Sequence, residues 1–234
     1  MMKKRLVGLL VSLIVVAMCV SASAAGKISV TQENFYSPES IFNYNYAFCK
    51  VENIGDKPIK VNAGIFEVFD VNGDVINSSD YLSDHASYLQ PGEYTYAEML
   101  CETPEDITEM PDDYALTITG KNDKSVISYR LPVKTELKLQ EDAGYYKQDN
   151  MYTEITNTTD EVIYDVSLVS ALLDDQGNIL YMEDKSFYND MGIMPGSSIV
   201  VRLEIPSSFV ELYEANALKP TVVDSIAYVD IDQD

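Results

Sequence analysis

The chain has 234 residues, with 38 acidic and 16 basic side chains and a formal net charge of −22 at pH 7. This charge argues against nucleic acids and anionic membrane surfaces as partners, because both are negatively charged themselves. Three cysteines and one histidine show no metal-ligand spacing, and no glycine-rich phosphate loop is present, so we expect neither an enzyme nor a bound cofactor.

The first 25 residues are typical of a signal peptide. Basic residues at 3–5 precede an apolar stretch at 6–20 and a small-residue cleavage site at 22–24. We therefore expect a secreted protein or one at the extracellular cell surface. Lipid anchoring at Cys19 is an alternative that fits less well, because Met18 is larger than the residue that normally precedes such a cysteine. After leader removal, no segment is long and apolar enough to cross a membrane.

An alternating strand pattern at 27–33 opens the mature chain and returns at 136–141. An aromatic-rich segment follows the first of these strands and is longer than its later counterpart. Aromatic side chains that lie exposed in an insertion offer stacking and interface surface. We expect this segment to form a contact surface that includes Phe35, Tyr36, Phe42 and Tyr44.

One sequence frame occurs twice, at 53–92 and at 157–196. Each copy has an asparagine turn, a long apolar strand, a glycine hairpin and a Pro-Gly turn, and matching positions lie 104 residues apart throughout. Many short strands separated by regular turns are typical of antiparallel β-sandwiches. We predict an all-β chain with two tandem immunoglobulin-like β-sandwiches, at 26–133 and 134–234, each with a short helical turn.

The long strand of the first copy, expected at 58–70, is apolar on both sides. We predict that Phe66 and Val68 face the core, as does Leu172 in the second copy. Ile65 and Phe69 are then candidates for a contact surface, although packing under a loop or against the other copy explains them as well.

Two cysteines remain after leader removal, and both belong to the first copy. Cys49 and Cys101 lie on the apolar sides of their predicted strands, so both are expected to point into the same core. An exported protein can hold them as a disulfide. Two buried free thiols that act as small hydrophobes are the alternative.

The hairpin after the long strand contains Asp70, Asn72 and Asp74, which resemble the opening of a calcium loop. The later glutamate that would complete such a loop is missing. A hairpin turn calls for the same residue types, so these three positions are weak metal candidates.

The copies diverge after their last shared strand. Thr103-Pro104 and Ser208, the latter in a capping-box pattern, each predict a short helix. The first copy then continues with strand candidates at 114–119 and 125–131, whereas the second has one at 222–231. The boundary near 132–135 contains no flexible Gly/Ser tract, so we expect a restricted orientation of the two domains.

The motif F-E-V-F-D at 66–70, followed by Asn72-Gly73 and by Leu89 and Pro91-Gly92, resembles the FxLYD-type domain of bacterial secreted and surface proteins. The second copy departs further, with Ser170 where that motif has phenylalanine. The resemblance covers part of each copy and implies an immunoglobulin-like sandwich at the cell surface. It implies no catalytic activity and no ligand, because the motif residues are structural.

Together these patterns favour an exported, non-catalytic binding protein whose partner is a protein or glycan at the bacterial cell surface. A calcium-binding module is the first alternative. A hydrolase that uses paired carboxylates is the second, because two acidic side chains can suffice for such chemistry.

Overall fold

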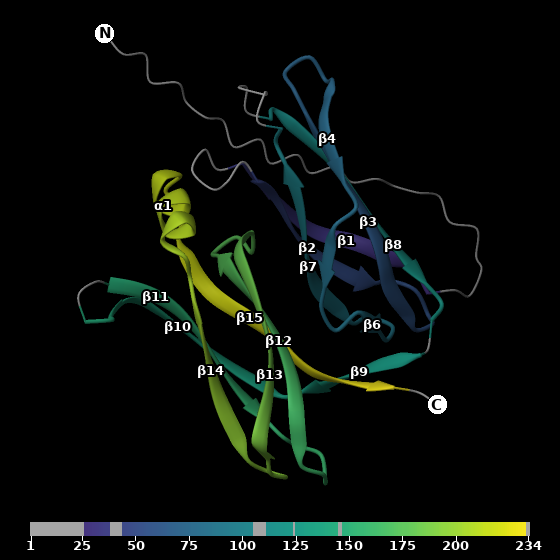
Figure 1. Ribbon diagram of the computed structural model, residues 1–234, viewed down its shortest axis with the longest axis vertical. Coiled ribbons are helices and arrows are strands. Elements are labelled where there is room, and N and C mark those ends of the chain that lie inside the picture. Colours follow the sequence, from purple (N-terminus) through teal and green to yellow (C-terminus); the bar gives the residue numbers. More distant parts are fainter. Residues whose placement is uncertain (1–25, 38–43, 105–110, 124, 145–146, 233–234) are drawn as a thin grey trace.

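The computed structural model describes residues 26–37, 44–104, 111–123, 125–144 and 147–232, without the side chains of Asn189 and Met191. The predicted signal peptide, Phe42 and most of the first predicted helix lie outside these ranges. The described chain is all-β, with antiparallel sheets and one helix (Figure 1). None of the described residues forms a helix of the length and apolarity that a membrane span requires.

The first half of the chain forms two sheets that face each other. Sheet A has the strand order β1-β2-β7-β5, where β1 is Ile28–Tyr36, β2 is Tyr44–Asn53, β7 is Tyr94–Glu102 and β5 is Leu82–Asp84. Sheet B is built on β3, which pairs with three other strands. Its members are β3 (Ile59–Phe69), β4 (Val75–Ser79), β6 (Tyr88–Leu89) and β8 (Asp113–Lys121).

The core between sheets A and B follows the predicted alternation. Phe66 and Val68 of β3 are fully buried and pack with Cys49, Met99 and Cys101 of sheet A. The alternating side chains of a strand point to opposite faces, so every second residue of β2, β3 and β7 enters this core. The predicted core positions Phe66 and Val68 are thus confirmed.

The second half adds two more sheets. Sheet D has the order β10-β11-β14, with β10 at Val133–Asp142, β11 at Lys147–Thr156 and β14 at Ser198–Glu204. Sheet C has the order β13-β12-β15-β9, with β13 at Ile179–Ile193, β12 at Ile163–Asp174, β15 at Pro220–Asp232 and β9 at Val126–Leu131. Leu172 of β12 is fully buried, as predicted, and Ser170 beside it bonds to Thr153 and Ser225.

Strand β9 belongs to a different sheet from the one that the sequence suggested. It precedes the expected boundary near residue 133, yet it pairs with β15 from Leu131 opposite Ala227 to Val126 opposite Asp232. The strand before it, β8, pairs with β3. The apolar pattern of a strand predicts which of its side chains are buried but not which strand pairs with it. Here the partner is β15.

The helix α1 (Ser207–Ala215) lies between β14 and β15. The capping box predicted at Ser208 is wrong, because the helix starts after Pro206 and no side chain caps its first turn. Proline at the N-cap position already fixes a backbone φ of −59° that suits the entry to a helix. Phe209 and Tyr213 face inward and anchor the helix.

The repeat seen in the sequence is also a repeat of hydrogen bonds. Asn53 is fully buried, and its Nδ2 donates to the carbonyl oxygens of Lys57 at 2.8 Å and Leu89 at 3.0 Å. The matching asparagine, Asn157, donates from Nδ2 to the carbonyl oxygens of Glu161 at 2.8 Å and Ile193 at 2.7 Å. In each Pro-Gly turn the glycine N–H donates to the backbone carbonyl oxygen of the asparagine. The positive φ of Gly92 and Gly196 suits the predicted turn type.

A second hydrophobic core joins the two halves. Phe48 of sheet A is buried, and its ring centroid lies 6.3 Å from Tyr181 of sheet C and 5.8 Å from Phe209 of α1. Sheet A therefore packs on sheet B with one face and on sheet C with the other. Val169 and Ala171 of β12 are fully buried in this shared core.

Polar contacts fix the junction between the halves. The hydroxyl groups of Tyr94 and Tyr96 both donate to Asp224 Oδ2 at 2.7 Å. The Tyr36 hydroxyl donates to the carbonyl oxygen of Ile179 at 2.9 Å. These bonds cross the junction at separate points, so the halves hold one relative position.

Candidate functional site

The aromatic segment predicted as a contact surface is only partly exposed. Tyr36 is buried at the junction, so its assignment to an exposed surface is wrong. Phe35 is half-buried and stacks on Tyr114 with ring centroids 4.8 Å apart. Tyr44 is 37% exposed, and Phe42 lies outside the described residues. The segment mainly joins sheets rather than presenting an aromatic face.

The two candidates on β3 differ from each other. Ile65 is 52% exposed, whereas Phe69 is half-buried. Ile65 pairs with Thr117 of β8 on the outer face of sheet B, where its neighbours on β8 are mostly polar. A single exposed isoleucine among polar residues is ordinary for a protein surface.

Cys49 and Cys101 point into the same core, as predicted, and both are free thiols. Cys49 pairs with Ala97 on β7, four residues from Cys101. At about 3.3 Å per residue, the two Cα atoms are about 14 Å apart, whereas a disulfide needs less than about 7 Å. Burial raises the pKa of Cys49 well above its usual value and that of Cys101 to about 11, which keeps both thiols protonated at neutral pH.

The weak metal candidates form a hydrogen-bonded turn. Asp70 Oδ1 accepts from the backbone N–H groups of Asn72 at 2.8 Å and Asp74 at 2.9 Å. These bonds, with that of Asn72 Nδ2 to Asp70 Oδ2, lower the pKa of the Asp70 carboxyl group. Asp174 holds the second copy's turn in the same way, so turn geometry accounts for the shared residues.

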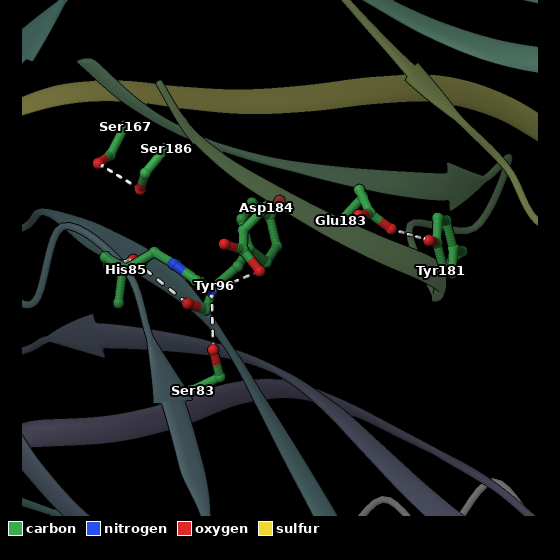
Figure 2. A network of polar contacts seen from close by, with 9 residues as sticks. Ser83, His85, Tyr96, Ser167, Tyr181, Glu183, Asp184 and Ser186 are labelled. Carbon is green, nitrogen blue, oxygen red and sulfur yellow. Dashed lines mark hydrogen bonds and ion pairs between the residues drawn. The ribbon is translucent and has the colours of Figure 1, made fainter. Parts of the chain in front are cut away.

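A polar network lies at the junction and includes the single histidine (Figure 2). His85 is nearly buried, and its Nε2 lies 3.3 Å from Ser83 Oγ and 3.8 Å from Asp184 Oδ1. Burial lowers the His85 pKa, although Asp184 and Asp84 act in the opposite direction. The imidazole is therefore neutral at pH 7, and its contact with Asp184 is not an ion pair there.

This network does not have the geometry of a catalytic triad. In a triad the nucleophile and the orienting carboxylate contact different nitrogens of the histidine ring. Here Ser83 and Asp184 both lie near Nε2. The group therefore acts as a contact between β5 of the first half and β13 of the second.

Three carboxyl groups also meet at the junction. Glu98 of β7 is half-buried, and its pKa is raised to about 7 by burial and then by the nearby charges of Asp184 and Glu183. Burial raises the pKa of Glu183 as well, while the Tyr181 hydroxyl donates to its carboxylate (Figure 2). The charged form of Glu98 is thus disfavoured by both its surroundings and its neighbours.

Glu98 should make the stability of the protein depend on pH. Its folded-state pKa is higher than the unfolded value, so its stabilising contribution is complete below pH 4.5 and is lost as the pH rises through about 7. We expect Glu98→Gln to raise the free energy of unfolding by about 2 kcal/mol at pH 8 and to change it little at pH 4. Urea unfolding at both pH values tests this. The exposed Glu211→Gln serves as control, and an equal effect of Glu98→Gln at pH 4 and pH 8 would contradict the assignment.

A groove opens on the second half, away from this network. It is shallow and wide open to solvent, and it lies between β13 and β14, which contact each other. We call it the β13–β14 groove. Its lining residues are Lys185, Phe187, Tyr188, Asp190, Ile199, Val200, Val201 and Arg202.

The β13–β14 groove combines exposed apolar groups with positive charge. Tyr188 and Val200 are 65% and 64% exposed. Tyr188 stacks on the exposed Tyr164, with ring centroids 6.4 Å apart. Lys185 and Arg202 add two positive charges, and Asp190 is the one carboxylate among the lining residues, although Arg202 also pairs with Glu204 at 2.9 Å.

The groove exists because the two repeats use one stretch of chain differently. In the first half, β5 leaves β4 and pairs with β7, with Ser83 opposite Glu98. The matching residues of the second half, 186–188, stay in β13 and pair with β12. Sheet A therefore has four strands and sheet D three. Among the described residues, no strand pairs with the outer edge of β14.

No protein-family model matches the chain, and the search of curated proteins found no match. The geometry of the site therefore carries the functional argument. The candidate sites predicted from the sequence do not include the groove, which arises from a difference in strand pairing between the repeats. The signal available was the replacement of Leu82-Ser83-Asp84 by Ser186-Phe187-Tyr188, which puts two aromatic residues in place of a polar edge strand.

Proposed function

We propose that the protein is an exported, non-catalytic binding protein of the bacterial cell surface. In this proposal each half is an immunoglobulin-like sandwich, and the β13–β14 groove binds the ligand. The observation that carries it is the exposed Tyr188 and Val200 on a groove that also presents Lys185 and Arg202. Tyrosine and arginine at the centre of an interface contribute much of the binding energy in known complexes.

Several features support binding over catalysis. Glu98 and Glu183, whose pKa values are raised, are at the junction, Glu33, whose pKa is also raised, lies on β1, and the lining of the groove has the single carboxylate Asp190. A carboxylate-dependent hydrolase needs two convergent acids in one substrate pocket. The Asp70 turn uses its acceptor oxygens for backbone N–H groups, so a calcium module has no observation in its favour.

The proposal is tested by a single exposed substitution. We expect Tyr188→Ser to weaken binding of residues 26–234 to the cell envelope or to surface glycans about tenfold, because loss of an aromatic anchor costs about 1–2 kcal/mol or more. Retention of the variant on envelope preparations and on glycan arrays measures this loss of binding. Tyr81→Ser is the matched control, because Tyr81 is 55% exposed and lies outside the groove. Equal binding by both variants would overturn the proposal.

A further inference from the structure

The outer edge of β14 offers main-chain hydrogen bonds that the described strands leave unused. The N–H of Ile205 donates to the carbonyl oxygen of Asp149 at 2.9 Å, so Ile205 directs its backbone groups toward β11. Backbone groups alternate sides along an antiparallel strand. Val201 and Leu203 therefore also face β11, whereas Val200 and Arg202 direct their N–H and C=O groups to the open edge.

The first half shows what occupies such an edge. There β5 pairs with β7, with Leu82 opposite Met99, Ser83 opposite Glu98 and Asp84 opposite Ala97. Matching positions of the two repeats lie 104 residues apart, so these three β7 positions correspond to Leu203, Arg202 and Val201 of β14. An extended segment of at least three residues thus fits the position that β5 would take in sheet D.

We propose that the β13–β14 groove binds an extended peptide segment of another protein, which pairs with β14 as the fourth strand of sheet D. This mode of recognition adds a strand to an exposed sheet edge, where main-chain bonds give affinity and alternate side chains give specificity. The inference rests on the proposed binding function and specifies its ligand class.

The side chains of β14 specify the sequence of the peptide. Val201 and Leu203 face the core between sheets C and D, so the peptide residues opposite them are apolar. The residue between them lies opposite Arg202 on the outer face, where the half-exposed Arg202 guanidinium also pairs with Glu204 at 2.9 Å. A cross-strand pair of opposite charges is favourable, so this residue is acidic. The recognised pattern is apolar–acidic–apolar.

Charge argues against a second copy as the occupant. Each chain carries a formal net charge of −22, so two copies repel each other on approach. A partner segment with one acidic residue that matches Arg202 and Lys185, and with no further acidic charge, avoids this repulsion. Self-association through β14 is therefore an outcome that the experiment must be able to detect.

The probe is a fluorescent, end-capped peptide that copies residues 79–86 with Asp80→Ser, Ser83→Glu and Asp84→Val. These changes give the predicted Leu–Glu–Val pattern and leave a single acidic residue. Binding to residues 26–234 is measured by fluorescence anisotropy. N-methylation at the glutamate removes an N–H that faces β14 and should weaken binding about tenfold, whereas N-methylation at the leucine, whose N–H faces away, should change it about twofold or less.

Variants of the protein test the same geometry from the other side. Val200→Pro removes a donor at the open edge without removing a bond to β11, and it should weaken peptide binding about tenfold. Val200→Thr keeps the N–H and should bind like the original protein. Arg202→Glu should weaken binding of the original peptide and favour a peptide that carries lysine in place of its glutamate. Circular dichroism and urea unfolding confirm that each variant is folded.

The outcomes separate the two proposals. Absence of peptide binding at roughly 1 mM, a range that reports even weak complexes, overturns the strand-addition inference. Unchanged peptide binding by Val200→Pro also overturns this inference. A dimer linked through β14 that is detected by sedimentation overturns it as well. If Tyr188→Ser still weakens envelope or glycan binding in these cases, the binding function stands and its ligand is not a strand.

Discussion

Phe48→Ala should lower the free energy of unfolding by about 4 kcal/mol, in the range known for buried phenylalanine truncation. The Phe48 ring is 1% exposed and packs against aromatic rings of both halves, so its loss opens a cavity at their junction. Its partners are Tyr36, Tyr46, Tyr181 and Phe209. We also expect the unfolding transition, monitored in urea by circular dichroism and tyrosine fluorescence, to separate into two steps.

The matched control for this substitution is Phe66→Ala. Phe66 is as deeply buried as Phe48, but it packs in the core between sheets A and B and not at the junction. The loss of stability should be similar, but all four sheets should still unfold in one step, at a lower urea midpoint, because the junction is intact. If Phe48→Ala unfolds in one step with both probes coincident, the junction is not what couples the halves.

Asn157→Ala should cost about 3 kcal/mol, because it leaves one buried carbonyl oxygen, one partly buried carbonyl oxygen and one backbone N–H without their partner. The carbonyls are those of Glu161 and Ile193, and the N–H is that of Thr159. Thermal unfolding followed by circular dichroism measures the effect. Asn72→Ala, on an exposed turn, should cost less than 1 kcal/mol as the control.

The same substitution in the first half gives an internal comparison. Asn53 makes the equivalent contacts, so Asn53→Ala should destabilise the protein by a similar amount. Asn157→Asp distinguishes the roles of the amide atoms, because it keeps the acceptor for Thr159 but loses both donor bonds. A loss as small as that of Asn72→Ala would show that water satisfies these carbonyls.

Local features of this fold could be read from the sequence because they depend on local chemistry. Gly92 and Gly196 adopt the positive φ that their turns require, and Phe66 and Val68 are buried as their alternation predicts. The repeated asparagine marks a turn whose hydrogen bonds are the same in both copies. Such positions are specified within a few residues, so one sequence is sufficient to find them.

Long-range pairing could not be predicted in this way. The pattern of β9 suits a neighbour on either side of the expected boundary near residue 133, and its partner proves to be β15. Tyr36 looked like part of an exposed surface, because its hydroxyl partner, the carbonyl of Ile179, is distant in sequence. The groove escaped prediction for the same reason, since residues 186–188 could pair with β12 or with β14.

The pairing of β9 with β15 also constrains the order in which the chain can fold during synthesis. Leu131 meets Ala227, so the ribosome must add about a hundred residues before β9 finds its neighbour, which takes about 5–20 s at ordinary elongation rates. Strands β1 to β8 have all their partners among themselves and can close first. Throughout that interval β9 follows the first half as an unpaired strand, the segment of the nascent chain that a chaperone would protect.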